Sequence, residues 1–317
     1  MAVPDRRDVP ALFDAARAGN RAALARLLSV IERGGPAARD LGALSYPLAG
    51  SGYTVGITGA PGAGKSTMTS ALLSEVRRDV ERIGVLAIDP SSPFSGGAIL
   101  GDRVRMQDHA LDDAIFIRSM ATRGHLGGLA LATPEAVRLL EATGRALVLV
   151  ETVGVGQVEV EIAGAADTTV VVVNPGWGDA VQANKAGLME VADVFVINKA
   201  DRAGAEDTRR DLESMLDLSG HRPWRPPVLQ TVASDGAGLD ELWAAIGRHR
   251  AHVEGCGELT RRREQRQDDE LRRIVREELE QRARQVEGGA RYVEIREQVR
   301  SRRLDPWAAA AAVLADA

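Results

Sequence analysis

The sequence predicts an α/β fold with a doubly wound, mostly parallel sheet and helical extensions at both ends. Apolar runs rich in β-branched residues, such as TTVVVV at 168–173, are typical of strands buried on both faces of a parallel sheet. These runs alternate with helical patterns, as they do in doubly wound proteins. Aromatic residues make up only 3% of the chain, so the core must consist mainly of Val, Leu, Ile and Ala.

The alternation of patterns defines the expected strands and helices of a core domain at residues 51–256. The expected strands cover residues 53–58, 84–89, 114–119, 146–151, 168–174, 193–199 and 227–233. The expected helices between them cover residues 66–80, 133–143, 180–191 and 206–217.

Helical extensions are expected on either side of this domain. Residues 1–50 form the N-terminal extension, in which residues 10–33 have the spacing of two short helices and Asn20 caps the second. Residues 257–317 form a C-terminal helical arm. Its last short helix has Asp305 as cap and Pro306 at the first position.

The first half of the C-terminal arm is nearly all charge. A thin apolar stripe runs through it and consists of Leu259, Leu271, Ile274, Val275 and Leu279. A solvated helix is one explanation of the charge, but a narrow stripe needs burial somewhere. We favour packing against a second copy of the chain, which makes the arm a dimerisation element.

Composition excludes several classes of protein. The formal net charge of −5 argues against a general nucleic-acid binder. The single cysteine, Cys256, excludes an internal disulfide and a zinc site built on paired cysteines. The N-terminal residues lack the apolar core of a signal peptide, and no uncharged run approaches the roughly 20 residues of a membrane span. We therefore expect a cytoplasmic protein that binds neither nucleic acid nor membrane.

A phosphate-binding motif follows the first expected strand. The stretch GAPGAGKST matches G-x-x-x-x-G-K-[ST] and lies between a strand and a helix, as the mechanism requires. Glycines let backbone N–H groups turn toward phosphates, Lys65 reaches the outer phosphates, and Ser66 offers its hydroxyl to Mg²⁺. The expected phosphate-binding residues are Gly59, Gly62, Ala63, Gly64, Lys65, Ser66 and Thr67.

The base is addressed by NKAD, residues 198–201, at the end of a later strand. The Asp201 carboxylate can accept from the ring N–H and the exocyclic amino group of guanine, a pair that adenine lacks. Lys199 would cover the ring, and Asn198 would tie this loop to the phosphate loop. Ser234, after the last strand, is placed to touch the base. The pattern favours GTP over ATP.

Acidic strand ends complete the expected site. Glu151 ends a strand and fits the role of an acid that holds Mg²⁺ or its water, and Gly154 follows with an N–H that can contact the γ-phosphate. Asp89 ends another strand and is a second candidate carboxylate for Mg²⁺. Gln157 could position water, although a solvated loop glutamine is the simpler reading. Together these residues predict a Mg²⁺-dependent GTPase.

Longer runs carry a resemblance to one family. Residues 87–106, 116–130, 150–179 and 185–201, among them AIDPSSPFSGGAILGDRVRM and VETVGVGQVEVEIAGAADTTVVVVNPGWGD, closely resemble the methylmalonyl-CoA mutase-associated GTPases. This MeaB/ArgK/MMAA group belongs to the metallochaperone class of P-loop GTPases. The resemblance covers roughly residues 50–255, and the helical regions on either side also look like that family's extensions.

The resemblance implies a homodimeric G-protein chaperone of an adenosylcobalamin-dependent acyl-CoA mutase. GTP binding and hydrolysis would gate cofactor delivery and protect or rescue the mutase, so adenosylcobalamin would be met only through the partner. By the same resemblance Asp89, Asp102 and Glu151 surround Mg²⁺. Residues 176–185 would form a switch segment in which Lys185 approaches the nucleotide, giving Lys65, Glu151, Gln157 and Lys185 as the catalytic candidates.

Two alternatives stay open at this point. A nickel-insertion GTPase has a similar core, but such relatives generally carry His-rich or paired-Cys sites that this sequence lacks. A scaffold that binds nucleotide with little turnover is the other. Trp177 and Asn184 depart from the family's usual residues in the switch segment, which favours either a particular partner surface or local packing.

Overall fold

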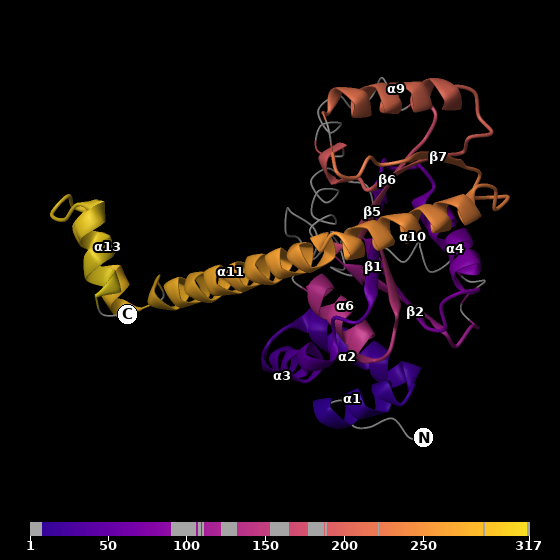
Figure 1. Cartoon of the computed structure of the whole chain (residues 1–317). Helices are drawn as coiled ribbons and strands as arrows, with labels where there is room; N and C mark the ends of the chain where they lie inside the picture. The colour runs from indigo at the N-terminus through magenta and orange to yellow at the C-terminus, as the bar shows by residue number, and fades with distance from the viewer. Residues whose placement is uncertain are drawn as a thin grey trace. The chain divides into compact units, whose positions relative to one another are not determined.

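The computed structural model describes residues 8–89, 106, 109, 111–121, 132–152, 165–176, 187, 189–220, 222–287 and 289–315. Contacts divide the chain into two units, Met1–Leu259 and Thr260–Ala317, and each is described by itself. Figure 1 shows the elements of both. The division into three parts at residues 50 and 256 stays a prediction.

The first unit contains a seven-stranded sheet in which every neighbouring pair of strands is parallel. The strands are β1 (Tyr53–Gly59), β2 (Ile83–Asp89), β3 (Ile115–Ala121), β4 (Leu147–Thr152), β5 (Thr168–Val173), β6 (Val194–Asn198) and β7 (Val228–Thr231). Their order is β3-β2-β4-β1-β5-β6-β7. The predicted fold class is confirmed, and each expected strand forms with ends that differ by two residues at most.

Helices cover both faces of this sheet, which explains why its central strands are apolar on both sides. The helices of the unit are α1 (Val9–Arg17), α2 (Arg21–Arg33), α3 (Pro36–Ser45), α4 (Lys65–Val76), α6 (Ala132–Ala142), α9 (Ala205–Leu218) and α10 (Leu239–Gly255), with a 3₁₀ turn η1 (Tyr46–Leu48). One core joins α4 and α10 to one face. On the other face, α1, α2, α3 and α6 pack on β2, β3 and β4, and α9 packs on β5 and β6. In β2, β4, β5 and β6, alternate residues pack into the cores on opposite faces of the sheet.

The N-terminal extension is part of the first unit rather than a loose appendage. Its two expected helices are present, and the side chain of Asn20 accepts from the backbone N–H of Ala23 at 3.0 Å, as expected of the cap. The sequence analysis did not predict α3. Gly34 and Gly35 adopt positive φ angles of 69° and 83°, and Pro36 then starts the helix at its first position. Burial of Leu41 completes the packing of α3.

The second unit is helical. It contains α11 (Glu258–Glu287), which begins at the end of the first unit, then α12 (Ala290–Arg300) and α13 (Pro306–Leu314). Asp305 accepts from the N–H groups of Trp307 and Ala308, so the predicted cap of α13 is confirmed. Among its described residues α11 buries none. Leu271 and Leu279 of the apolar stripe are 61% and 58% exposed.

The last turns of α11 form an apolar groove with α12 and α13. Its volume is about 360 Å³. The lining includes Val286, Tyr292, Ile295, Val299, Ala309 and Val313. Among the helices that the structure describes, none is long and apolar enough to cross a membrane.

Candidate nucleotide-binding site

The predicted nucleotide-binding residues that the structure describes meet at one edge of the sheet. β1, β4, β6 and β7 all run in the same direction, so their carboxyl ends lie together. After β1 the chain forms β2, β3 and β4 on one side of this strand. It then crosses over and forms β5, β6 and β7 on the other side. In open α/β sheets ligands bind outside the carboxyl ends at such a reversal of strand order.

The glycines of the phosphate loop are required by its backbone path. Gly59 has a φ of 132°, and a Cβ there would lie 1.9 Å from the carbonyl oxygen of Val172 in β5. The next residue, Ala60, donates its N–H to that same carbonyl at 3.2 Å. Gly64 has a φ of 90°, and a Cβ there would lie 2.5 Å from the Nδ2 of Asn198. Only glycine fits these two positions without displacing a neighbour.

Lys65 is the first residue of α4, and its side chain turns back into the loop. The residue is buried, and its Nζ donates to the carbonyl oxygens of Gly59 at 2.7 Å and Ala60 at 2.9 Å. A positive charge therefore lies inside a turn at the N-terminal end of a helix, where the helix dipole adds positive potential. This arrangement suits the outer phosphates of a nucleotide.

Ser66 and Glu151 meet beside the phosphate loop. The Oγ of Ser66 donates to the Oε1 of Glu151 at 2.5 Å, and both residues are buried. Glu151 is in register with Ile57 of β1 and Ala87 of β2, which fixes its position at the carboxyl edge. A hydroxyl and a carboxylate are hard oxygen donors, so the pair fits Mg²⁺. Among the described residues, no group of three or more His, Cys, Asp or Glu side chains gathers as a metal site.

Asn198 joins three segments that are distant in sequence. Its Nδ2 donates to the carbonyl oxygen of Ala63 in the phosphate loop at 2.8 Å, which is the tie that the sequence analysis expected. Its Oδ1 accepts from the N–H of Ala233 at 3.1 Å and from the hydroxyl of Thr231 at 3.2 Å. Asn198 and Thr231 are both buried, so these bonds are shielded from water.

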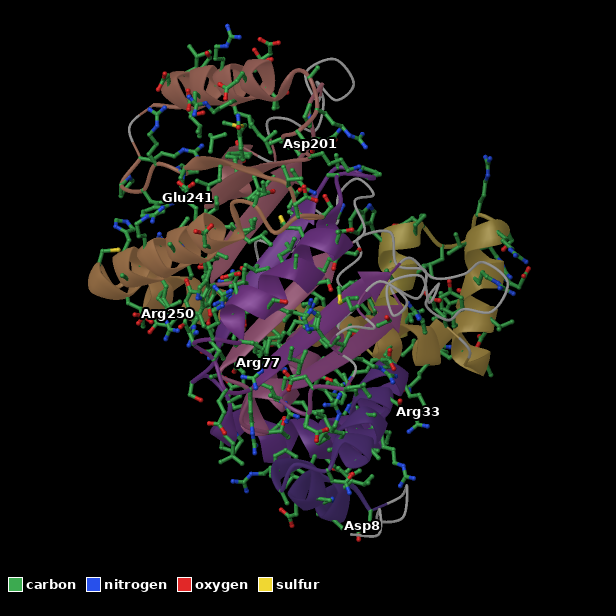
Figure 2. The ribbon with its side chains drawn as sticks, turned by 90° about the vertical axis from the view of Figure 1, so that its right-hand side faces the viewer. Asp8, Arg33, Arg77, Asp201, Glu241 and Arg250 are labelled. Carbon is green, nitrogen blue, oxygen red and sulfur yellow. The ribbon has the colours of Figure 1, made fainter. Side chains whose placement is uncertain are left out.

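Lys199 and Asp201 extend from the end of β6. Lys199 has a φ of 60°, an uncommon backbone conformation for a residue with a side chain, and its Nζ donates to the carbonyl oxygen of Gly62 at 2.7 Å. Asp201 and Ser234 are exposed. Figure 2 labels Asp201 beyond the sheet, near α9. Its carboxylate is therefore accessible to a base.

Other candidates lie outside the described residues. They are Gly154, Gln157, Asp102 and Lys185, together with Trp177 and Asn184. The backbone of Asp89 ends β2 at the same edge as Glu151, but the described structure does not include its side chain. Thr67 is exposed in the first turn of α4, and Ala63 is buried beneath the loop.

Sequence reasoning missed the residues that support the site from behind. Thr231 holds the amide oxygen of Asn198, and the hydroxyl of Thr152 donates to that of Thr58 at 3.1 Å beneath the loop. No motif marks them. The only available signal is that each is a threonine at or next to the carboxyl end of a strand.

A parallel sheet, a phosphate loop closed by Lys65, and the ties made by Asn198 define a P-loop GTPase. The sequence profile of "Methylmalonyl Co-A mutase-associated GTPase MeaB" matches residues 24–288 of the chain. The chain therefore belongs to the MeaB family.

Individual relatives agree with this assignment. A protein of Pyrococcus abyssi is 47% identical over 310 residues, covering 96% of this chain and 95% of the relative. GTPase ArgK of Escherichia coli is 39% identical over 272 residues, covering 83% and 82% of the two chains. A crystal structure described as an LAO/AO transport system kinase matches with a TM-score of 0.72 and 28% identity, covering 98% of each chain.

Substituting Gly64→Ala tests the close approach of the phosphate loop to Asn198. The new Cβ would fall 2.5 Å from Nδ2, so we expect GDP affinity to fall at least about tenfold as the tie to Ala63 breaks. The measurement is a nucleotide titration by calorimetry. Gly19→Ala is the matched control, since Gly19 has a φ of 94° but nothing within 4 Å of its Cβ position. Equal affinities of the two variants would contradict the proposed constraint.

Proposed function

We propose that this GTPase is a G-protein chaperone of an adenosylcobalamin-dependent acyl-CoA mutase of the methylmalonyl-CoA mutase type. GTP binding and hydrolysis would gate loading of the cofactor and protect or reactivate the mutase. The observation that carries the proposal is the match, over residues 24–288, to a family described as mutase-associated. The cofactor would belong to the partner, and both proteins would act in the cytoplasm.

The function is tested by the rate of GTP hydrolysis with and without candidate mutases. Intrinsic hydrolysis is expected to be slow, on the order of 10⁻³ to 10⁻² per second. We expect one cobalamin-dependent mutase to raise the rate at least about tenfold, with no turnover of ATP in parallel reactions. The protein would not be a chaperone of these enzymes if no mutase changed the rate or bound to it in either nucleotide state.

The proposed base site consists of Asn198, Lys199, Asp201 and Ser234. Asp201 is exposed at the end of β6, next to a lysine and an asparagine that are both bonded to the phosphate loop. A carboxylate at this point can accept two hydrogen bonds from guanine and none from the adenine ring. Lys199 would lie against the face of the base, and Ser234 would approach its edge.

Replacing Asp201 tests guanine recognition. Asp201→Asn replaces one accepting carboxylate oxygen by an amide group that donates. GTP affinity should therefore fall by about two orders of magnitude or more, while affinity for xanthosine triphosphate should rise. Competition binding against a fluorescent nucleotide measures both. Asp207→Asn, an exposed substitution in α9, is the control. Loss of binding to every nucleotide is expected for Lys65→Ala. The same loss in Asp201→Asn would indicate a folding defect rather than altered specificity.

The proposed metal site includes Ser66 and Glu151, whose oxygens lie 2.5 Å apart. We add Asp89 and Asp102 as candidate carboxylates from the resemblance. Bound Mg²⁺ would neutralise charge on the β- and γ-phosphates and act as a Lewis acid. Glu151 and Ser66 would orient that ion, Lys65 would hold the outer phosphates, and Gly154 would contact the γ-phosphate. We assign Gln157 to water positioning and Lys185 to approach from the switch segment.

Glu151→Gln tests the metal role directly. The amide keeps the size of the side chain but removes its charge, so the Mg²⁺ concentration for half-maximal hydrolysis should rise about 10- to 100-fold. Binding of GDP without Mg²⁺ should change little. Glu141→Gln is a matched control, because Glu141 is also buried but bonds to the N–H of Gly50 instead. An unchanged Mg²⁺ requirement in Glu151→Gln would exclude Glu151 from the metal site.

We also propose that the chain forms a homodimer through the C-terminal arm. α11 has the exposed stripe Leu271, Ile274, Val275 and Leu279, and the same unit has an apolar groove of about 360 Å³. Exposed apolar surface of this extent on one small unit favours a partner of matching character. A second copy of the chain has the same apolar stripe and is therefore a partner of matching character.

Ile274→Glu tests the dimer. A charge in the middle of the stripe should convert a dimer to monomers at micromolar concentration, because a buried unpaired charge in an interface is costly. Sedimentation velocity measures the change. Glu277→Ala, an exposed substitution on the same helix, should stay dimeric. A wild-type chain that sediments as a monomer would refute the proposal.

A further inference from the structure

Three arginines gather at the edge of the sheet opposite the phosphate loop. Arg82 precedes β2, Arg145 precedes β4, and Arg21 is the first residue of α2. The N–H of Ala146 donates to the carbonyl oxygen of Arg82 at 3.2 Å, which brings Arg82 beside the turn that contains Arg145. We refer to Arg21, Arg82 and Arg145 as the arginine cluster.

Shared contacts place the three side chains in the same region, around one aromatic ring and one turn. The guanidinium carbon of Arg145 lies 5.7 Å from the centre of the Phe116 ring, and that of Arg21 lies 5.9 Å from the same centre. The Nη1 of Arg82 lies 3.6 Å from the Cβ position of Gly144, next to Arg145 in the chain. The cluster therefore surrounds one aromatic ring and one turn.

Positive charge exceeds negative charge around Arg145. The residue is only 6% exposed, and its Nη1 donates to the carbonyl oxygen of Thr143 at 2.9 Å. In the described part of the chain no carboxylate pairs with Arg145, and its buried Nε has no hydrogen-bond partner. Burial lowers the pKa of Arg145 to about 10, and repulsion from Arg82 and Arg21 adds to this shift.

Two carboxylates lie near the cluster, of which one bonds to groups outside it and the other contacts Arg21 from an exposed position. Asp112 accepts from the Nε of Arg77 at 2.9 Å and from the N–H of Ala114 at 2.9 Å. These hydrogen bonds lower the pKa of Asp112, and the bond from Arg77 has the largest effect. Asp113 lies 3.6 Å from the Nη1 of Arg21, but its side chain is 99% exposed, so this pair is weak. Arg77 is labelled in Figure 2.

We propose that the arginine cluster binds the phosphate group of a small anionic ligand, at a site separate from the nucleotide. Guanidinium groups match the geometry of phosphate oxygens and bind them with paired, charge-assisted hydrogen bonds. The two sites lie at opposite ends of β2, whose seven residues span roughly 20 Å. Arg145 is too enclosed for an extended acidic protein surface, whereas a compact anion can bind the exposed side chain of Arg82 in the positive field of the buried Arg145.

The main competing explanation is a purely structural role for Arg145. Its bond to Thr143 lies just past the C-terminal end of α6, where the helix dipole favours a cation. The Phe116 ring adds a cation–π contact. If these two contacts satisfy the charge completely, the cluster has no need of an anion and will not bind one.

Calorimetry on the full-length protein distinguishes the two explanations. The protein is first saturated with Mg²⁺ and a non-hydrolysable GTP analogue, which fills the phosphate loop, and is then titrated with inorganic pyrophosphate or with ribose 5-phosphate. We expect at least one to bind, and the preference between them identifies a diphosphate or a monoester as the ligand class. Arg82→Ala should weaken that binding about tenfold, the effect of losing one charge-assisted hydrogen bond.

Controls separate this site from the nucleotide site and from general charge effects. Arg33→Ala, an exposed substitution at the far end of α2 that is labelled in Figure 2, should leave the affinity unchanged. Arg82 is itself exposed, so Arg82→Ala should fold and bind the GTP analogue normally. The anion should still bind to Lys65→Ala, because that substitution disables the phosphate loop and leaves the arginine cluster intact. Absence of anion binding, or equal affinities of Arg82→Ala and Arg33→Ala, would overturn the proposal.

Discussion

The hydrogen bonds of Asn198 are the interaction on which the rest of the site depends. One buried amide joins the phosphate loop through Ala63, the last strand through Thr231 and the following loop through Ala233. Because Gly64 has no side chain, the amide can approach the loop closely enough to donate. The phosphate loop and the segment that begins at Asn198 are thus fixed relative to one another, which is the physical basis of preorganised binding.

Much of this arrangement could be predicted from the sequence because it depends on local signals. Strands such as Thr168–Val173 are buried on both faces, so every residue in them is apolar or a threonine and the pattern is unmistakable. The phosphate loop is a contiguous motif, and its glycines are required by backbone conformations that other residues rarely adopt. Asn20 and Asp305 are caps whose partners lie three residues away or fewer, so they too could be assigned without tertiary information.

Other features could not be predicted because they depend on contacts between distant segments. The bond from Thr231 to Asn198 spans 33 residues, and nothing in either neighbourhood marks it. The arginine cluster unites residues that precede two strands and begin a helix, so it emerges only when the sheet has assembled. Helix α3 was missed because it is short, contains Gly42 and has only two large apolar side chains, and packing on α1, α2 and α6 compensates for weak local preference.

The pairing of β1 has a consequence for how the chain is made. Tyr53 pairs with Leu147, and Val55 pairs with Thr168, so both neighbours of this strand are encoded about a hundred residues later. At synthesis rates of about 5–20 residues per second, β1 emerges from the ribosome and waits several seconds for either partner. An apolar strand that leads into a glycine-rich loop is exposed during that time. Until synthesis has passed β5, β1 therefore lacks the parallel neighbours that bury its backbone in the finished sheet.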